Sequence, residues 1–326
     1  MEAENTTCRS ISDFTLSGIP DLDDLNFWLG FPLVLMYVMA VLGNLTIIYI
    51  IKVHQALHSP MYVFLLMLSI VELLIATTTM PKMLGIFWFD SRRITFDMCL
   101  TQMFSIHFLS TMESGILTAM AFDRYVAISH PLKYSSFFTN QTIIKITFFI
   151  MVRGIAGVMP LPLLVKRFPL WRSNLLTHSY CLHQEVMKLA CADITVNVII
   201  GLVIVFTVMC NDSLFILFSY LLIIKTVACL ADESNLKAIN TCTAHLCAVL
   251  IYYIPVINAS VAHRFQYGSI PHLPVLFGNV YLLLPPMINP LIYGIKTKQI
   301  YKRLIKLFLN RRCKVNIAGL WTTKKM

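Results

Sequence analysis

Charged residues are scarce in this sequence. Of its 326 residues only 13% are charged and 57% are hydrophobic, and the mean hydropathy is +0.73. Soluble domains are about one quarter charged, so this composition excludes a water-soluble globule. The 12 glycines and 14 prolines follow no period, and long polar tracts are absent, which excludes collagen-like and disordered chains. The composition therefore indicates a polytopic membrane protein.

Acidic residues are missing from the C-terminal segment. Residues 296–326 contain ten Lys and Arg but no Asp or Glu, whereas the remaining chain balances at 16 basic and 16 acidic residues. The formal net charge of +10 is therefore local to one tail. Such a tail favours contact with anionic membrane lipids, and we expect no nucleic-acid partner.

Common catalytic motifs are also lacking. The chain has no Walker loop, no dinucleotide-binding glycine motif, no HExxH and no GxSxG, so we expect no enzyme. We expect no metal or organic cofactor either, apart from an Na⁺ ion considered below. A membrane proton or ion carrier, or an enzyme that uses the buried carboxylates Glu72 and Glu113, is the alternative function.

Seven apolar runs are long enough to span a bilayer, since about 30 Å of hydrocarbon requires about 20 helical residues. They cover residues 28–51, 60–86, 100–122, 146–165, 194–224, 238–262 and 273–295. The predicted fold is an all-α membrane protein with a seven-transmembrane-helix bundle. We expect an extracellular N-terminus at 1–27, the transmembrane domain at 28–295, and a cytoplasmic amphipathic helix and basic tail at 296–326.

The distribution of Lys and Arg predicts the orientation. With the C-terminus inside, sixteen basic residues lie on the cytoplasmic side and eight outside, which favours an extracellular N-terminus. Asn5 lies in the sequon Asn5-Thr6-Thr7 and is a candidate for glycosylation. No inverted repeat relates the first and last three runs, which disfavours a transporter.

The segment after the seventh run has the pattern of an interfacial amphipathic helix. Ile300, Leu304, Leu307 and Phe308 fall on one face, with basic residues on the others. Cys313 follows two arginines and is a candidate for palmitoylation.

Polar residues form two helical stripes. His107, Ser110, Thr111 and Ser114 share one face of the third span, and the sixth span carries Tyr253, Ile257, Ser260 and Arg264. If both stripes face inward, they form the walls of a ligand cavity, roofed by the loop that carries His183 and Gln184. The alternative is that Arg264 extends to the headgroups and that His107 is a satisfied core residue.

The chain contains four distinctive motifs, LHSPMY at 57–62, MAFDRYVAI at 120–128, KAINTCTAH at 237–245 and PPMINPLIY at 285–293. These motifs resemble the signatures of olfactory receptors, a branch of the rhodopsin-like G-protein-coupled receptors. In this order they extend the resemblance over residues 27–308. The loop at 179–191 and the sequence His263-Arg264-Phe265 are similar to the class I, fish-like branch.

The resemblance implies an odorant receptor of the plasma membrane that activates a stimulatory heterotrimeric G protein and raises cAMP. It implies that Asp123 and Arg124 pair in the inactive state at the inner end of the third span. The residues of this G-protein switch would be Asp123, Arg124, Tyr125, Tyr220, Asn289, Pro290 and Tyr293.

The ligand is expected to be a small carboxylic acid. A guanidinium such as that of Arg264 offers a fork of donors that matches a carboxylate, and class I receptors often respond to water-soluble acids. The expected ligand contacts are His107, Ser110, Thr111, Gln184, Tyr253, Ile257, Ser260 and Arg264.

The resemblance also places Glu72 close to Glu113 in mid-membrane. Two carboxylates in a medium of low dielectric constant do not both ionise cheaply, so they either share a proton or bind Na⁺.

The outer segments contain four cysteines that could form disulfides. Cys99 and Cys181 both lie outside, and the resemblance implies that they form a bridge. Trp171 occupies a position where this branch commonly has a cysteine, so Cys191 has lost its usual partner. We expect Cys191 to be a free thiol, with pairing to Cys8 as the alternative.

Overall fold

The structure is a computed structural model that describes residues 8–19, 23–228, 232–265 and 272–307. The side chains at 23–26, 232–241, 259–265 and 272–274 are not described. Asn5, Phe308 and Cys313 lie outside the described residues, so the glycosylation and palmitoylation predictions stay predictions.

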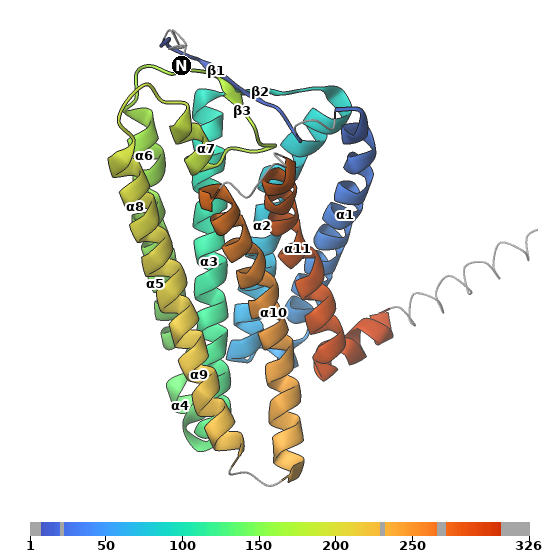
Figure 1. The fold of residues 1–326 in the computed structure, drawn as a ribbon. Coiled ribbons are helices and arrows are strands. Elements are labelled where there is room, and N and C mark those ends of the chain that lie inside the picture. The colour runs from blue at the N-terminus through green and yellow to red at the C-terminus, as the bar shows by residue number, and fades with distance from the viewer. Residues whose placement is uncertain (1–7, 20–22, 229–231, 266–271, 308–326) are drawn as a thin grey trace, which may run out of the picture.

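Within the described residues the long helices group into seven units. These units pack side by side in a bundle, as Figure 1 shows. Five are single or nearly continuous helices: α1 (Asp23–Val53), α2 (Pro60–Phe89), α3 (Phe96–Ser129), α10 (Asp232–Phe265) and α11 (His272–Lys296). The fourth unit consists of α5 (Asn140–Val158) followed by α6 (Pro160–Lys166). The fifth consists of α8 (Thr195–Val205), the π-helical segment η3 (Phe206–Cys210) and α9 (Asn211–Val227). The predicted seven-helix bundle is confirmed.

Five of these units are long and apolar enough by composition to cross a membrane, namely 27–53, 60–89, 140–166, 195–227 and 275–296. The helix α3 is more polar because it is central: it contacts α2, α5, α9 and α10, and buries Glu113 and Asp123 against them. On α5, by contrast, Ile144, Phe148 and Phe149 are exposed on the outside of the bundle. An apolar exterior around a polar centre is the arrangement that a lipid environment requires.

Short elements connect the long ones. On the inner side these are η1 (Gln55–Leu57), η2 (Pro131–Lys133) and α4 (Tyr134–Phe137). On the outer side, α7 (His183–Lys188) lies in the long connection between α6 and α8. The helix α2 ends at Phe89, and the C-cap residue Asp90 has a positive φ of 49° that reverses the chain into the next outer segment.

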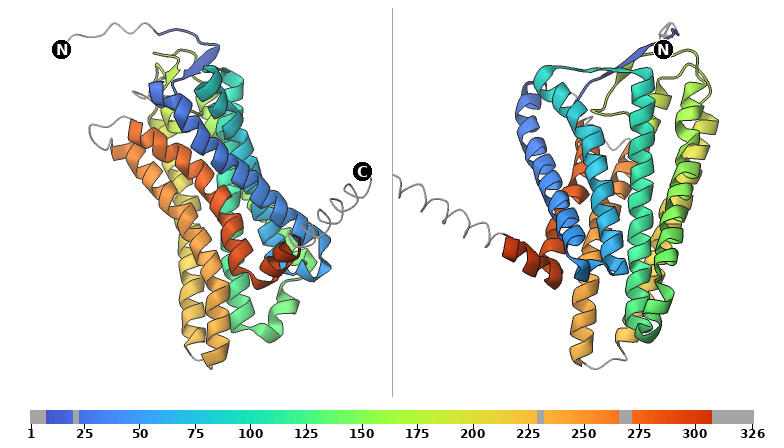
Figure 2. Two further views of the ribbon diagram at one scale, coloured as in Figure 1. Left: turned by 90° about the vertical axis from the view of Figure 1, so that its right-hand side faces the viewer. Right: turned by 180° about the vertical axis from the view of Figure 1, so that it is seen from behind.

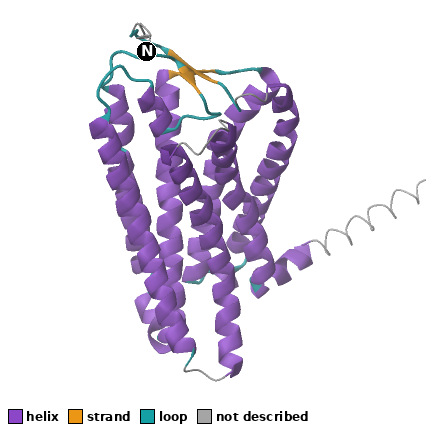
Figure 3. Ribbon diagram, in the orientation of Figure 1, coloured by secondary structure: helices purple, strands orange, loops and turns teal. Residues whose placement is uncertain are grey.

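The strands of the structure are confined to one end of the bundle, as Figure 3 shows. The strands β1 (Asp13–Leu16), β2 (Arg93–Thr95) and β3 (Leu175–Leu176) form one sheet in the order β2-β1-β3. β1 is antiparallel to β2 and parallel to β3. We call residues 8–19, 90–95 and 167–194 the outer cap.

Two disulfides hold the outer cap. Cys99 at the start of α3 is bonded to Cys181, as expected. Cys8 is bonded to Cys191, so the expectation that Cys191 is a free thiol is wrong. The physical reason is that the N-terminal segment crosses the long loop: Arg9 exchanges two backbone hydrogen bonds with Trp171, which places Cys8 beside Cys191.

A helix at residues 298–307 follows α11 at the opposite end of the bundle from β1, as Figure 2 shows. Ile300 is fully buried, Leu304 and Leu307 pack against the main hydrophobic core, and Tyr62 donates a hydrogen bond to Gln299. The predicted amphipathic helix therefore packs its apolar face partly on the bundle itself.

Candidate functional site

A cavity of about 300 Å³ lies near the outer end of the bundle. It is enclosed by α3, α6, α8, α10 and α11 and roofed by residues of α7. Most of its lining is apolar, including the aliphatic side chains of Val158, Leu161, Leu202, Val205 and Val256. Cavities of this size and character bind small organic molecules.

Four of the predicted ligand contacts line this cavity: His107, Ser110, Thr111 and Gln184. Three residues of the α3 stripe thus line the cavity, whereas Ser114 is hydrogen-bonded to Asp212 and Tyr253. The side chains of Ser260 and Arg264 lie outside the described part of the chain, although both residues are within the outer turns of α10.

Two expected contacts on α10 lie elsewhere. The side chain of Ile257 is 56% exposed on the outside of the bundle, whereas the neighbouring Val256 lines the cavity. One residue corresponds to about 100° of helical rotation, so the predicted face of α10 was off by one position. Tyr253 is buried below the cavity and is bonded to Ser114 at 2.9 Å between hydroxyl oxygens.

Hydroxyl groups connect the cavity floor to two other helices. The Oγ of Ser110 lies 3.0 Å from the hydroxyl of Tyr252 on α10 and 2.7 Å from that of Tyr281 on α11. The Tyr252 hydroxyl also donates to the backbone carbonyl of Ser110 at 2.7 Å. A ligand that bonds to Ser110 would therefore compete with contacts between three helices.

A buried ion pair lies beside this floor and was not predicted. The guanidinium of Arg153 on α5 donates to both carboxylate oxygens of Asp212 on α9, at 2.6 and 2.8 Å. Ser114 of α3 donates to the same carboxylate at 2.6 Å and also contacts Tyr253 of α10. Four helices thus meet in one polar network. The presence of opposite charges in two spans was the signal that could have found the pair.

The roof end of the cavity carries two polar atoms without partners. Among the described residues, Nε2 of His183 and Nδ2 of Asn197 are buried and have no hydrogen-bond partner. Arg167 holds the Asn197 side chain by donating to its Oδ1 at 3.1 Å. Burial lowers the pKa of His183 to about 3, with a smaller effect from nearby His107, so its ring is neutral at pH 7. Both side chains can therefore bond to a polar group of a ligand.

Glu72 and Glu113 lie within electrostatic reach of each other in the middle of the bundle. Asn289 of α11 donates to Oε1 of Glu72 at 2.5 Å. Oε1 of Glu113 is buried and has no hydrogen-bond partner in the part of the chain that the structure describes. This arrangement is compatible with either a shared proton or a cation between the two carboxyl groups.

The predicted switch residues lie toward the inner end. Arg124 donates to the carboxylate of Asp123 through Nε at 3.0 Å and Nη2 at 2.5 Å, and Tyr134 donates to the other oxygen at 2.6 Å. Asp123 is fully buried, whereas the Arg124 side chain is 11% exposed. Tyr125 is partly buried next to His130.

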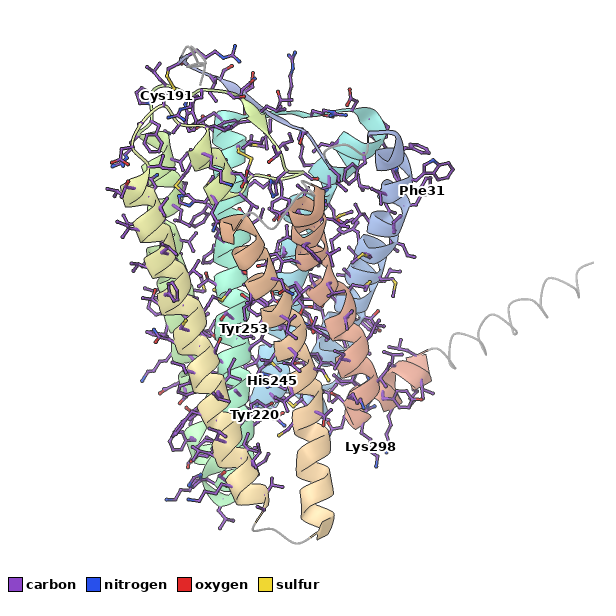
Figure 4. All side chains as sticks on the ribbon, viewed as in Figure 1. Phe31, Cys191, Tyr220, His245, Tyr253 and Lys298 are labelled. Carbon is purple, nitrogen blue, oxygen red and sulfur yellow. A yellow bond between two sulfur atoms is a disulfide. The ribbon has the colours of Figure 1, made fainter. Side chains whose placement is uncertain are left out.

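On the facing helices, Tyr220 is hydrogen-bonded to His245 at 2.7 Å, and His245 also contacts the carbonyl of Leu117 on α3. Figure 4 shows Tyr220, His245 and Tyr253 along α9 and α10. Tyr293 is buried with its hydroxyl unpartnered among the described residues. Pro290 of α11 packs closely against Gly43 of α1.

Comparisons with known proteins agree with this geometry. The sequence profile described as "Olfactory receptor" matches residues 33–311. The chain is 54% identical to human olfactory receptor 51E1 over 92% of this chain and 94% of that protein. It is 52% identical to mouse olfactory receptor 51E2 over 90% and 92% of the two chains.

The fold is similar to that of squid rhodopsin, with a TM-score of 0.73 at 14% identity, over 89% of this chain and 87% of the rhodopsin chain. The resemblance stated from the motifs is thus confirmed, and so is the prediction that the protein is not an enzyme. The chain belongs to the olfactory receptor family, and it is a multi-pass plasma-membrane receptor for odorants that couples to a G protein.

Proposed function

We propose that this receptor binds small carboxylic acids in the outer cavity and activates a stimulatory G protein, which raises cAMP. The observation that carries the proposal is the combination of an aliphatic cavity with unpartnered polar atoms at its roof end. Such a site suits a molecule with a short apolar body and one polar head.

The polar head would lie at the roof. The Nδ2 of Asn197 is a donor and therefore favours an acceptor on the ligand, and His107, His183 and Gln184 lie in the same lining. Arg264 is the residue we propose to neutralise a carboxylate, because its guanidinium offers two parallel donors. Its position in the last turn of α10 is on the roof side of the bundle.

The apolar body would lie toward Val205, Val208 and Val256. Each methylene that becomes buried there contributes about 0.8 kcal/mol. The ligand shifts the receptor toward the active state only by its difference in affinity for the two states. The contacts of Ser110 with Tyr252 and Tyr281 provide such a difference, because they join the cavity floor to α10 and α11.

The test is a cAMP assay in transfected cells with straight-chain acids and the alcohols of matched chain length. Arg264→Ala is expected to shift the half-maximal acid concentration upward at least about tenfold, since loss of one partner of a buried charged contact costs about 2–5 kcal/mol. Arg264→Lys should restore potency only in part. Arg172→Ala, which removes an exposed arginine from the same outer side, is the matched control.

An alcohol as the best agonist, with equal potency on Arg264→Ala and on the unchanged receptor, would show that Arg264 does not bind an anion. A response in calcium without any rise in cAMP would contradict the stimulatory coupling.

We also propose that Glu72 and Glu113 form the site of a shared proton or of Na⁺. Replacing Na⁺ in the medium by a large organic cation distinguishes a shared proton from a bound Na⁺. The agonist dose response should change under this replacement only if the site binds Na⁺. Glu113→Gln should abolish any such sodium effect, because it leaves a single carboxylate.

A further inference from the structure

The N-terminal strand lies at the centre of the outer sheet and not at its edge. Within the described residues, β2 and β3 are joined only through β1, in which Phe14 pairs with Ile94 and Leu16 pairs with Leu176. β1 therefore connects the α2–α3 segment to the long loop that roofs the cavity.

The side chains of β1 form the interior of the outer cap. Phe14 and Leu16 are fully buried, and the ring of Phe14 packs edge-on against Trp171 with centroids 5.5 Å apart. Trp171 itself is 2% exposed. The same hydrophobic cluster includes Val186 and Met187 of α7. The N-terminal segment thus packs with the roof helix in one core.

Backbone bonds continue this connection toward the end of the roof. Arg9 and Trp171 exchange two hydrogen bonds of 3.0 and 2.9 Å, and Trp171 in turn pairs with Ala190. The amide of Cys191 donates to the carbonyl of Leu170 at 3.0 Å. Three chain segments therefore run side by side next to the Cys8–Cys191 bridge.

The two disulfides lie on either side of the roof helix in the sequence. α7 spans His183–Lys188, while Cys181 is bonded to Cys99 of α3 and Cys191 is bonded to Cys8. Without the second bridge, a disulfide would hold the segment that carries α7 on its N-terminal side only. Figure 4 shows Cys191 at the outer extreme of the molecule, on the same side as α7.

We propose that the segment Cys8–Leu16 is a positioning element of the ligand cavity. In this role Cys8 and Phe14 are positioning residues that act through α7, whose His183, Gln184 and Met187 line the cavity. The N-terminal strand then sets the height of the roof above the ligand, and hence agonist potency. This inference rests on the proposed ligand site.

The bridge can be opened selectively in the full-length receptor. Cys8 is exposed and Cys191 partly exposed, whereas Cys99 and Cys181 are completely buried. A membrane-impermeant phosphine reductant applied to cells that already display the receptor should therefore open Cys8–Cys191 first. Mass-tag labelling of free thiols identifies the bond that opened. This procedure avoids dependence on a variant that fails to reach the surface.

Two readouts test the proposal. The first is the acid dose response at matched surface level, in which opening the bridge should raise the half-maximal concentration about tenfold with the maximum unchanged, because the roof loses preorganisation. The second needs no ligand: backbone hydrogen exchange of residues 183–188 in purified receptor should accelerate after reduction. The double variant Cys8→Ser/Cys191→Ser should show both effects without reductant and no further change with it. Phe14→Ala should shift potency in the same direction with the bridge intact.

Cys210→Ser, which removes an exposed free cysteine of η3, is the matched control and should leave both readouts unchanged. Unchanged exchange of α7 and unchanged potency, once labelling shows that Cys8–Cys191 is open, would overturn the proposal. If acids fail to activate even the untreated receptor, the proposed ligand class is wrong, and the exchange measurement still decides whether the N-terminal segment positions α7.

Discussion

Arg153 and Asp212 form a two-pronged ion pair between α5 and α9, with N–O distances of 2.6 and 2.8 Å. The Asp212 side chain is only 5% exposed, so its carboxylate has lost most of its hydration. Among the described residues, the side-chain donors that replace the lost water are Arg153 and the hydroxyl of Ser114. This pair joins the helices on either side of the ligand cavity floor.

We expect Arg153→Ala and Asp212→Ala each to destabilise the receptor by about 3–5 kcal/mol, because each leaves an uncompensated buried charge. The double variant Arg153→Leu/Asp212→Leu should be less harmful than either single change. Surface display and thermal stability in detergent provide the measurement. Asp97→Asn, which breaks the exposed pair with Lys166, is the control and should have an effect below about 1 kcal/mol. Equal losses in the control and in the Arg153 variant would refute the expectation.

Arg124→Ala should abolish G-protein activation while surface display stays near normal. Asp123 keeps its hydrogen bond from Tyr134, and Arg124 lies on the inner side, far from the ligand cavity. The measurement is the agonist-stimulated cAMP rise, normalised to surface receptor. Lys133→Ala, which removes an exposed basic residue near the same inner surface, should retain the response. A full cAMP response from Arg124→Ala would rule out the proposed switch.

Cys99→Ser and Cys181→Ser should reduce surface display to the same extent, and the double variant should be no worse. Both side chains are fully buried and bonded to each other across 82 residues of sequence, and loss of such a bridge costs about 2–5 kcal/mol. Flow cytometry of an N-terminal tag measures the loss. Normal display and signalling by both single variants would contradict a structural role for the bridge.

The receptor should lose stability as the pH falls from 6.5 toward 3. Burial lowers the folded-state pKa of His183 to about 3, so in this window the unfolded chain binds a proton that the folded chain does not. Between pH 7 and pH 5 this difference amounts to up to about 2 kcal/mol. Thermal unfolding of purified receptor at several pH values measures it. The curve of His183→Asn should be flatter, and an identical slope would indicate that His183 does not contribute.

The bundle itself could be predicted from the sequence because hydropathy reports directly on lipid exposure. The ends of the helices could not: α3 extends from Phe96 to Ser129, several residues beyond the apolar run at each end, since polar residues at helix ends are stabilised by caps and loops rather than by lipid. The contact between Asp123 and Arg124 could be predicted from the sequence, because the two residues are adjacent in one motif and their pairing does not depend on how the helices pack.

Features that depend on helix rotation or on distant contacts could not be predicted. The choice of Ile257 over Val256 failed because α10 is apolar on several faces, which leaves its azimuth undefined. The pair of Arg153 and Asp212 joins residues 59 positions apart, and spacing alone does not bring them together. The alternation in Asp13-Phe14-Thr15-Leu16 did contain a strand signal, but only the structure shows that β1 lies between two other segments.

The π-helical segment η3 sets the rotation of α9 relative to α8 within the fifth helical unit. It separates α8, where Asn197 and Gly201 face the ligand cavity, from α9, where Asp212 faces Arg153. Winding the same five residues as a regular α-helix would turn everything beyond them relative to α8, because an α-helical residue rotates the chain by about 100° and a π-helical residue rotates it by less. The cavity wall would then keep its composition while Asp212 left its partner. The wide turn of this five-residue segment, more than its side chains, therefore keeps the ligand contacts of α8 and the ion pair of α9 in phase.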